Sequence, residues 1–151
     1  MGIGMTEKPT DELNELLAGT GPEHFDEYYR NNRQYLKETD REINYYFKNV
    51  LEEKKIKLRD VYIHADVSES YGGQILRMEK HTASRDLIIR LCLGGHFSLL
   101  ETNRALKLYG FSELYAKIPR DAMIIMAIHA RRFDIHELNE GLIGNGMEGL
   151  I

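Results

Sequence analysis

The sequence predicts an all-α protein, for three reasons. It contains only 3 prolines and no tryptophan in 151 residues, so long segments run without a helix breaker. Apolar residues recur at helical spacings in these segments. Capping pairs, in which a hydroxyl or carboxylate precedes a Glu by three residues, mark several helix starts. Length and composition, with 42% hydrophobic and 29% charged residues, suit one globular domain with an extension.

Residues 1–38 are predicted to form an acidic helical arm. This segment holds eight acidic and four basic side chains and therefore carries the whole net charge of −4. A short helix is expected over "TDELNELLAG", and Gly21-Pro22 separates it from a second helix. Three roles fit such an arm: docking on the core, forming a dimer surface, or binding a protein partner. The second helix carries apolar and aromatic residues at helical spacings: Phe25, Tyr28, Tyr29 and Leu36.

The next helix is expected to begin at Thr39, because Thr39 and Glu42 have the spacing of a capping box. It ends in "EEKKIK", where positive charge is favourable at the C-terminal end of the helix dipole. A short helix, "KLRDVYIHA", follows, and Asp66-Val67-Ser68 leads from it into a third helix. The first of these helices places five apolar residues on one stripe: Ile43, Tyr46, Phe47, Val50 and Leu51.

From residue 84 the sequence repeats itself. "SRDLIIRLCLGGHFSLLETNRAL" is answered by "PRDAMIIMAIHARRFDIHELNEGL", at an offset of 35 residues that becomes 36 at the phenylalanine. Each copy predicts a helical hairpin: an apolar helix, a turn ending in Phe, and a capped second helix. Two such hairpins can stack on one another. Residues 111–151 are therefore expected to form a C-terminal hairpin that repeats 84–106. The capping pairs are Ser98 with Glu101 and Asp134 with Glu137.

Each copy begins with an Arg-Asp pair, Arg85-Asp86 in the first and Arg120-Asp121 in the second. Such pairs resemble catalytic groups, but a structural explanation is sufficient. Each pair follows a cap residue, which places the Asp in the first turn of the helix. A negative charge there interacts favourably with the helix dipole.

Residues 56–80 fit, without gaps, the helix-turn-helix pattern of the lambda-repressor-like (Cro/C1 or XRE) family. In that pattern an amphipathic helix meets a tight turn, and a hydrophobic residue followed by Ser or Thr opens the recognition helix. Val67-Ser68 takes this place in the stretch "VSESYGGQILRMEK". The resemblance implies a five-helix domain, to which we assign residues 39–110. The inward-facing positions would be Ile56, Val61 and Ile75.

The whole chain also resembles a looser group of bacterial helix-turn-helix proteins. In this group an acidic arm precedes the domain and a second hairpin follows it; "ELYAKIPRDAMII" carries this resemblance. Such proteins are commonly catalogued as transcriptional regulators. The resemblance therefore implies a cytoplasmic bacterial regulator that binds double-stranded DNA, acting as a homodimer on a two-fold site.

Carried over position by position, the resemblance places the base-reading side chains at Glu69, Ser70 and Gln74. The Gln74 amide can pair bidentately with adenine in the major groove. Glu69 could accept from cytosine, but it would also repel nearby phosphate. Ser68, at the helix N-terminus, would offer a phosphate its N–H and hydroxyl groups. The flanking phosphate contacts would be Lys57, Arg77, Lys80 and His81.

Five departures from the family pattern accompany these matches. Leu58 occupies a position where a polar side chain often touches the backbone of the DNA. Tyr62 replaces the small residue, usually Ala, that lets the two helices approach closely. Asp66 replaces the turn Gly, a mild loss because Asp tolerates the left-handed conformation. Gly72-Gly73 weakens the recognition helix, although Gly72 facing Tyr62 would be an exchange of sizes between neighbours. Met78 replaces the Gly that usually ends the helix.

The charge distribution favours a competing hypothesis. Residues 39–81 hold eight acidic and eight basic side chains, and residues 82–151 also hold eight of each. Affinity for nucleic acid, in contrast, comes largely from basic side chains that neutralise phosphates. A helix-turn-helix-derived protein–protein adaptor in signalling, which has lost DNA binding, would fit this balance. Its partner would bind through the acidic arm or the C-terminal hairpin.

No enzymatic activity, cofactor or metal site is expected. The six histidines are scattered without a pair four residues apart, and no nucleophile has a base at a plausible spacing. The single cysteine, Cys92, lies in an apolar run and is expected to be a small buried hydrophobe, which suits a reducing cytoplasm. No apolar stretch approaches the length of a membrane span, and no signal peptide is visible.

Overall fold

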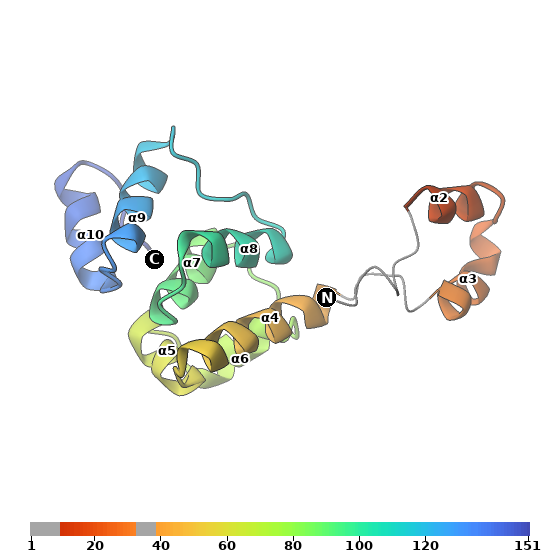
Figure 1. Ribbon diagram of the computed structural model, residues 1–151, viewed down its shortest axis with the longest axis horizontal. Coiled ribbons are helices and arrows are strands. Elements are labelled where there is room, and N and C mark those ends of the chain that lie inside the picture. Colours follow the sequence, from red (N-terminus) through yellow and green to blue (C-terminus); the bar gives the residue numbers. More distant parts are fainter. Residues whose placement is uncertain (1–9, 33–38) are drawn as a thin grey trace. The chain divides into compact units, whose positions relative to one another are not determined.

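The computed structural model describes residues 10–32 and 39–151, apart from the side chains of residues 10 and 39–41. Within these ranges the regular structure is helical and contains no strand, which confirms the all-α class (Figure 1). The chain divides into two compact units, Met1–Glu38 and Thr39–Ile151. In the ranges described, no helix is long and apolar enough to cross a membrane.

The first unit contains α2 (Thr10–Ala18), a 3-10 turn (Pro22–His24) and α3 (Phe25–Asn32). The helices are separated at Gly21-Pro22, as the sequence predicts, because Pro22 takes the first position of the 3-10 turn. Beyond the end of α2 the Thr20 hydroxyl donates to the Leu16 carbonyl at 2.6 Å. The expected continuation of the second arm helix to Leu36 lies outside the described residues.

The second unit begins with α4 (Thr39–Lys54), α5 (Leu58–Ala65) and α6 (Glu69–Leu76). The two hairpins follow as α7 (Arg85–Gly94) with α8 (Leu99–Tyr109), and α9 (Pro119–His129) with α10 (Ile135–Gly144). The first hairpin lies between α4–α6 on one side and the second hairpin on the other (Figure 1). Helix α4 begins at Thr39, but the Thr39 side chain of the expected capping box lies outside the described side chains.

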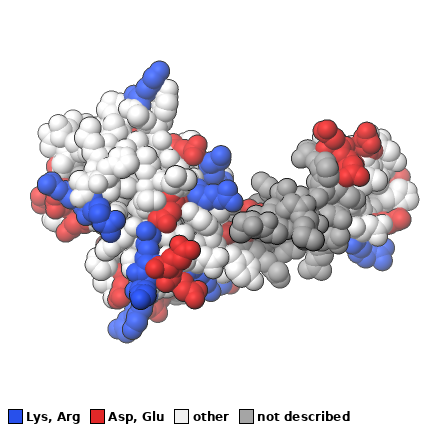
Figure 2. Space-filling model, in the orientation of Figure 1, with Lys and Arg blue, Asp and Glu red and all other residues white. Residues whose placement is uncertain are grey.

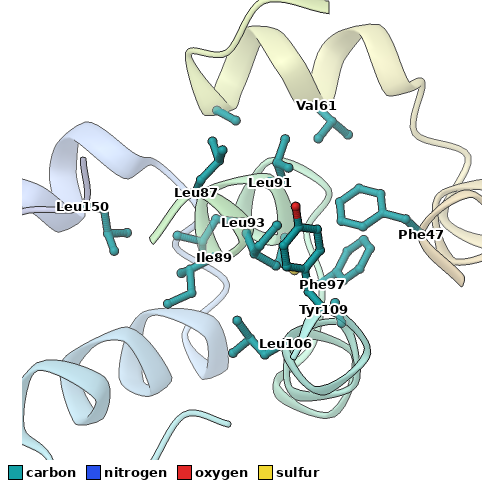
Figure 3. Packing of buried hydrophobic residues seen from close by; sticks show 14 of the residues in the cluster. Phe47, Val61, Leu87, Ile89, Leu91, Leu93, Phe97, Leu106, Tyr109 and Leu150 are labelled. Atoms are coloured by element: carbon teal, nitrogen blue, oxygen red, sulfur yellow. The ribbon is translucent and has the colours of Figure 1, made fainter. Parts of the chain in front are cut away.

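The core of the second unit is centred on the first hairpin. Leu91 faces Val61 of α5 and Phe97 faces Phe47 of α4, while Leu106 lies toward the second hairpin (Figure 3). The rings of Phe47 and Phe97 are 4.5 Å apart. Cys92 is completely buried as expected, and burial raises the pKa of its thiol far above the ordinary value. The predicted stripe of α4 is confirmed, with Tyr46 half-buried and the other four side chains buried.

The hairpins keep the repeated pattern in their helix ends. Ser98 forms a reciprocal capping box with Glu101, and Asp134 accepts from the Glu137 N–H at 3.2 Å. After the first helix of each hairpin, His96 and Arg131 both adopt left-handed conformations, with φ of 57° and 56°. The inserted residue is therefore Arg132, between this turn and the Phe. One expectation is corrected: Pro119 is the first residue of α9, and Ile118 before it provides no side-chain cap.

The two Arg-Asp pairs cross between the hairpins. Arg85 donates to both carboxylate oxygens of Asp121 at 3.0 and 2.9 Å, and Arg120 donates to both of Asp86 at 2.9 and 2.7 Å. Such reciprocity, in which residue i contacts j and j contacts i, is the pattern of a two-fold interface. The dipole explanation was incomplete: both Asp residues lie in first turns, but their main partners are the arginines of the other hairpin.

The repeat also extends beyond the last helix of each hairpin. The Asn103 side chain accepts from the Leu114 N–H at 2.9 Å, and Asn139 accepts from the Leu150 N–H at 2.7 Å. Each tail begins with a turn at a glycine in the left-handed region, which is Gly110 in the first hairpin and Gly146 in the second. Each unit of the repeat is therefore a helical hairpin with an extended tail held against its second helix.

Candidate nucleic-acid interface

A tight turn joins α5 to α6 at Asp66. Asp66 is left-handed, with φ of 56° and ψ of 48°, as expected for the position where the family pattern has Gly. Its N–H donates to the Ile63 carbonyl at 3.2 Å, and the Val67 N–H donates back to Tyr62 at 3.0 Å. These bonds close the end of α5 in the manner of a Schellman motif and set the direction of α6.

Arg90 of α7 holds this turn from the core side. Its guanidinium donates through Nε and Nη2 to the Ala65 carbonyl and through Nη2 to the Asp66 carbonyl at 2.9 Å. These acceptors include free carbonyls at the end of α5, where a positive charge is also favoured by the helix dipole. Sequence reasoning missed this role, because residues 65 and 90 lie far apart in the chain.

Gly72 and Tyr62 form the expected exchange of sizes. A Cβ added to Gly72 would lie 2.4 Å from Cε1 of Tyr62, far inside van der Waals contact. Tyr62 is buried to 5% exposure, and burial raises the pKa of its hydroxyl. Gly73 differs, since a Cβ there would meet only the far end of the Arg77 side chain. One glycine of the pair is therefore needed for packing and the other is not.

The first turn of α6 presents a polar surface. Ser68 caps the helix by accepting from the Tyr71 N–H at 3.1 Å. Glu69 and Ser70 are exposed, and Gln74 is half-buried one turn after Ser70. Residues four apart share a helix face, so Ser70 and Gln74 lie on the same side. Tyr71, in the same turn, is 40% exposed. It was not among the predicted site residues, although an aromatic residue at this position of the helix could have indicated it.

At the C-terminal end of α6, the basic side chain is paired with an acidic one within the chain. Met78 takes the left-handed conformation, with φ of 60°, at the position where the family pattern usually has Gly. Arg77 donates to the Glu79 carboxylate at 2.6 and 3.3 Å. This hydrogen-bonded pair raises the pKa of Arg77 and lowers that of Glu79. Arg77 is exposed, but a phosphate would have to compete with Glu79 for it.

The segment after α6 is fixed by Tyr109 of α8. The Tyr109 hydroxyl accepts from the Thr82 N–H at 3.0 Å, and the ring stacks on His81 with centroids 5.0 Å apart. Lys80 and His81 are exposed on this anchored segment. Two of the four expected phosphate contacts are thus held on a rigid support.

The structure divides the predicted site residues between two groups. Ser68, Glu69, Ser70 and Gln74 lie at the N-terminal end and in the first two turns of α6, while Arg77, Lys80 and His81 lie at or beyond its C-terminal end. Lys57 is exposed at the N-terminus of α5, the helix that precedes α6. Over the second unit, positive and negative side chains are interspersed on the face seen in Figure 2, without a broad basic patch.

Comparisons with models of protein families, with curated proteins and with solved structures gave no match to this chain.

Proposed function

We propose that residues 39–110 are a helix-turn-helix domain of the lambda-repressor type and that the protein binds double-stranded DNA as a transcriptional regulator. One observation supports the proposal: α5, the left-handed turn at Asp66 and the Ser68-capped α6 follow one another in the order of helix, tight turn and capped helix that the motif requires. A homodimer on a two-fold site is the mode of binding that the motif favours.

In this proposal α6 enters the major groove by its first turn. Ser70 and Gln74 read base edges, and Gln74 favours adenine. Ser68 keeps its hydroxyl hydrogen for a phosphate, since the oxygen acts as acceptor in the cap. The negative charge of Glu69 repels a phosphate that comes close to it. The cationic contacts to the backbone come from Lys57, Arg77 and Lys80, with a further contact from His81.

A titration with labelled random-sequence duplex tests this function. Fluorescence anisotropy at low salt should show binding. The logarithm of the association constant should fall steeply as the salt concentration rises. Lys80→Ala should weaken binding and reduce the salt slope by about one, because one phosphate contact is lost. Lys117→Ala, which removes an exposed lysine from the linker between the hairpins, is the matched control and should change neither value. Absence of binding at the lowest salt would overturn the proposal.

The Arg77–Glu79 pair allows a second test, in which a substitution should strengthen DNA binding. Glu79→Gln should strengthen DNA binding by a few-fold, because it frees Arg77 and removes a negative charge near phosphate. Arg77→Ala alone should weaken binding. In the Glu79→Gln background the loss caused by Arg77→Ala should be larger, and an equal loss in both backgrounds would show that Glu79 does not compete for Arg77.

The adaptor hypothesis remains the second candidate, favoured by the same pair. Arg77 is satisfied within the chain, and residues 39–81 carry equal numbers of acidic and basic side chains. A domain recruited for protein contact needs no cationic surface. It would keep the fold, leave the salt titration flat, and bind its partner elsewhere on the molecule.

A further inference from the structure

The second hairpin presents a groove between its two helices. Three residues of α9 and its C-cap line it at positions i, i+3, i+4 and i+7, the N-cap of α10 and three residues of that helix do so with the same spacing, and Arg132 lies between them. The groove has a volume of about 240 Å³. Met126 in its wall is 67% exposed although α9 is apolar around most of its circumference. The two stripes are Met123, Met126, Ala127 and Ala130, and Asp134, Glu137, Leu138 and Gly141.

Most of the equivalent face of the first hairpin is covered, although Ser98 is exposed and Glu101 is half-buried there. The repeat aligns Met126 with Leu91, which is 0% exposed. Helices α4 and α5 cover this face: a Cβ on Gly95 would lie 3.0 Å from Leu51 of α4, and one on Gly94 would lie 2.7 Å from the Val61 carbonyl of α5. The other counterparts are also buried: Ile88, Cys92, Thr102 and Ala105.

The two hairpins differ in how the glutamate at the edge of this face is paired. In the first hairpin Lys54 of α4 pairs with Glu101 at 3.0 Å, and both side chains are about three-quarters buried. Burial alone would raise the pKa of Glu101, but the Ser98 N–H and the Lys54 ammonium outweigh it and hold the pKa below its ordinary value. Its counterpart Glu137 is 60% exposed and has Arg132 at 3.8 Å.

One position decides which kind of helix fits the second groove. Gly94, against which α5 packs closely, corresponds to His129, whose imidazole is exposed. A helix placed like α5 would collide with this ring, whereas the change under α4 is smaller, from Gly95 to Ala130, and adds one methyl group. A helix placed like α4, which packs mainly on the second helix of the first hairpin, would therefore fit this groove better than one placed like α5.

We propose that the α9–α10 groove is a docking site for an amphipathic helix of a protein partner with the chemistry of α4. Such a helix carries an aromatic and aliphatic stripe, as Phe47, Val50 and Leu51 do in α4, and a lysine near its C-terminal end that pairs with Glu137. This inference does not rest on DNA binding, because the surface belongs to the second hairpin.

A peptide of residues 42–57 is the probe, since it carries the helix chemistry that covers the first groove. Labelled at its N-terminus and titrated with the full chain, it should bind saturably. Met126→Glu should weaken binding at least about tenfold, because it puts a charge in the apolar wall. Leu100→Glu is the matched control: Leu100 is 82% exposed on α8, outside the groove, and its substitution should leave binding unchanged.

Charge reversal tests the rim contact separately. The peptide with Lys54→Glu should bind the unaltered protein about fivefold more weakly, and Glu137→Lys in the protein should restore its affinity. Failure of the peptide to bind, or binding indifferent to Met126→Glu, would overturn the proposal. It would also be overturned if sedimentation showed a dimer that Met126→Glu dissociates, since a second copy would then fill the groove.

Discussion

At the scale of single residues, the contact between Tyr62 and Gly72 explains how α6 packs closely against α5. The bulky ring occupies the space that a side chain on α6 would fill, and the two helices still meet. The paired glycines are therefore not equivalent. Gly72 is fixed by the 2.4 Å approach of Tyr62, whereas Gly73 has only the flexible end of Arg77 above it.

Alanine at the two positions should have opposite effects. Gly72→Ala should lower the free energy of unfolding by about 1–3 kcal/mol, because the methyl group overpacks against Tyr62. Gly73→Ala should raise it by up to about 1 kcal/mol, because alanine is the better helix former. Urea denaturation followed by circular dichroism measures both values. Equal effects at the two sites would show that the Tyr62 ring moves away readily.

At the scale of elements, the turn between α5 and α6 is fixed by backbone conformation and by Arg90. The left-handed residue is Asp66, which carries a Cβ where the family pattern has glycine. Arg90 donates to two carbonyls at this corner and so joins it to α7. The orientation of the proposed recognition helix therefore depends on the first hairpin and not only on its own sequence.

Substitution of Asp66 should reveal the cost of its conformation. Asp66→Gly should raise the free energy of unfolding by about 0.5–1 kcal/mol, because glycine adopts the left-handed region without strain. Asp66→Val should lower it by about 1–2 kcal/mol, because a branched Cβ is disfavoured there. Thermal and urea unfolding of the three proteins give the comparison, and a valine variant as stable as wild type would contradict it.

At the scale of the second unit as a whole, the crossed ion pairs join the two hairpins. Asp121 is 2% exposed and accepts from both Arg85 and the Tyr115 N–H at 3.0 Å. Burial by itself would raise the pKa of Asp121, but Arg85 and the Tyr115 N–H outweigh it, and the pKa lies below its ordinary value. The pair of Arg120 with Asp86 is more open, with both side chains 23% exposed.

The buried carboxylate should matter more than its counterpart. Asp121→Asn should lower the free energy of unfolding by about 3 kcal/mol, because it leaves Arg85 partly buried without its countercharge. Asp86→Asn should cost about 1 kcal/mol at its more solvated site. Urea denaturation at neutral pH measures the difference, and equal losses would contradict it.

The same carboxylate predicts a pH dependence. A depressed pKa in the folded state contributes stability that is complete above the unfolded value of about 3.9 and is lost as the pH falls through the folded value. The difference between wild type and Asp121→Asn should therefore shrink below about pH 4. Urea denaturation from pH 7 to pH 2 tests this, and a difference that stays constant would show that the Asp121 charge does not stabilise the fold.

Local patterns in the sequence predict the helices. The features that the sequence did not predict are contacts between residues far apart in the chain. Caps such as Ser98 and breakers such as Gly21-Pro22 act within a few residues, so the elements could be predicted. The crossed arginines and the Arg90 contact join residues about 25 to 36 positions apart, and spacing alone does not identify such partners. The proposed DNA-reading surface is local to α6, whereas the competition of Glu79 for Arg77 needed the side-chain geometry.

The crossed Arg-Asp pairs also give the two hairpins the contacts of a two-fold dimer. A free hairpin with one such pair would satisfy both charges by associating with an identical hairpin, forming two equivalent ion pairs at once. Because both hairpins belong to one chain, they make these contacts without the translational entropy lost on association. Their outer faces differ: α4 and α5 pack on that of the first hairpin, whereas the groove of the second is open.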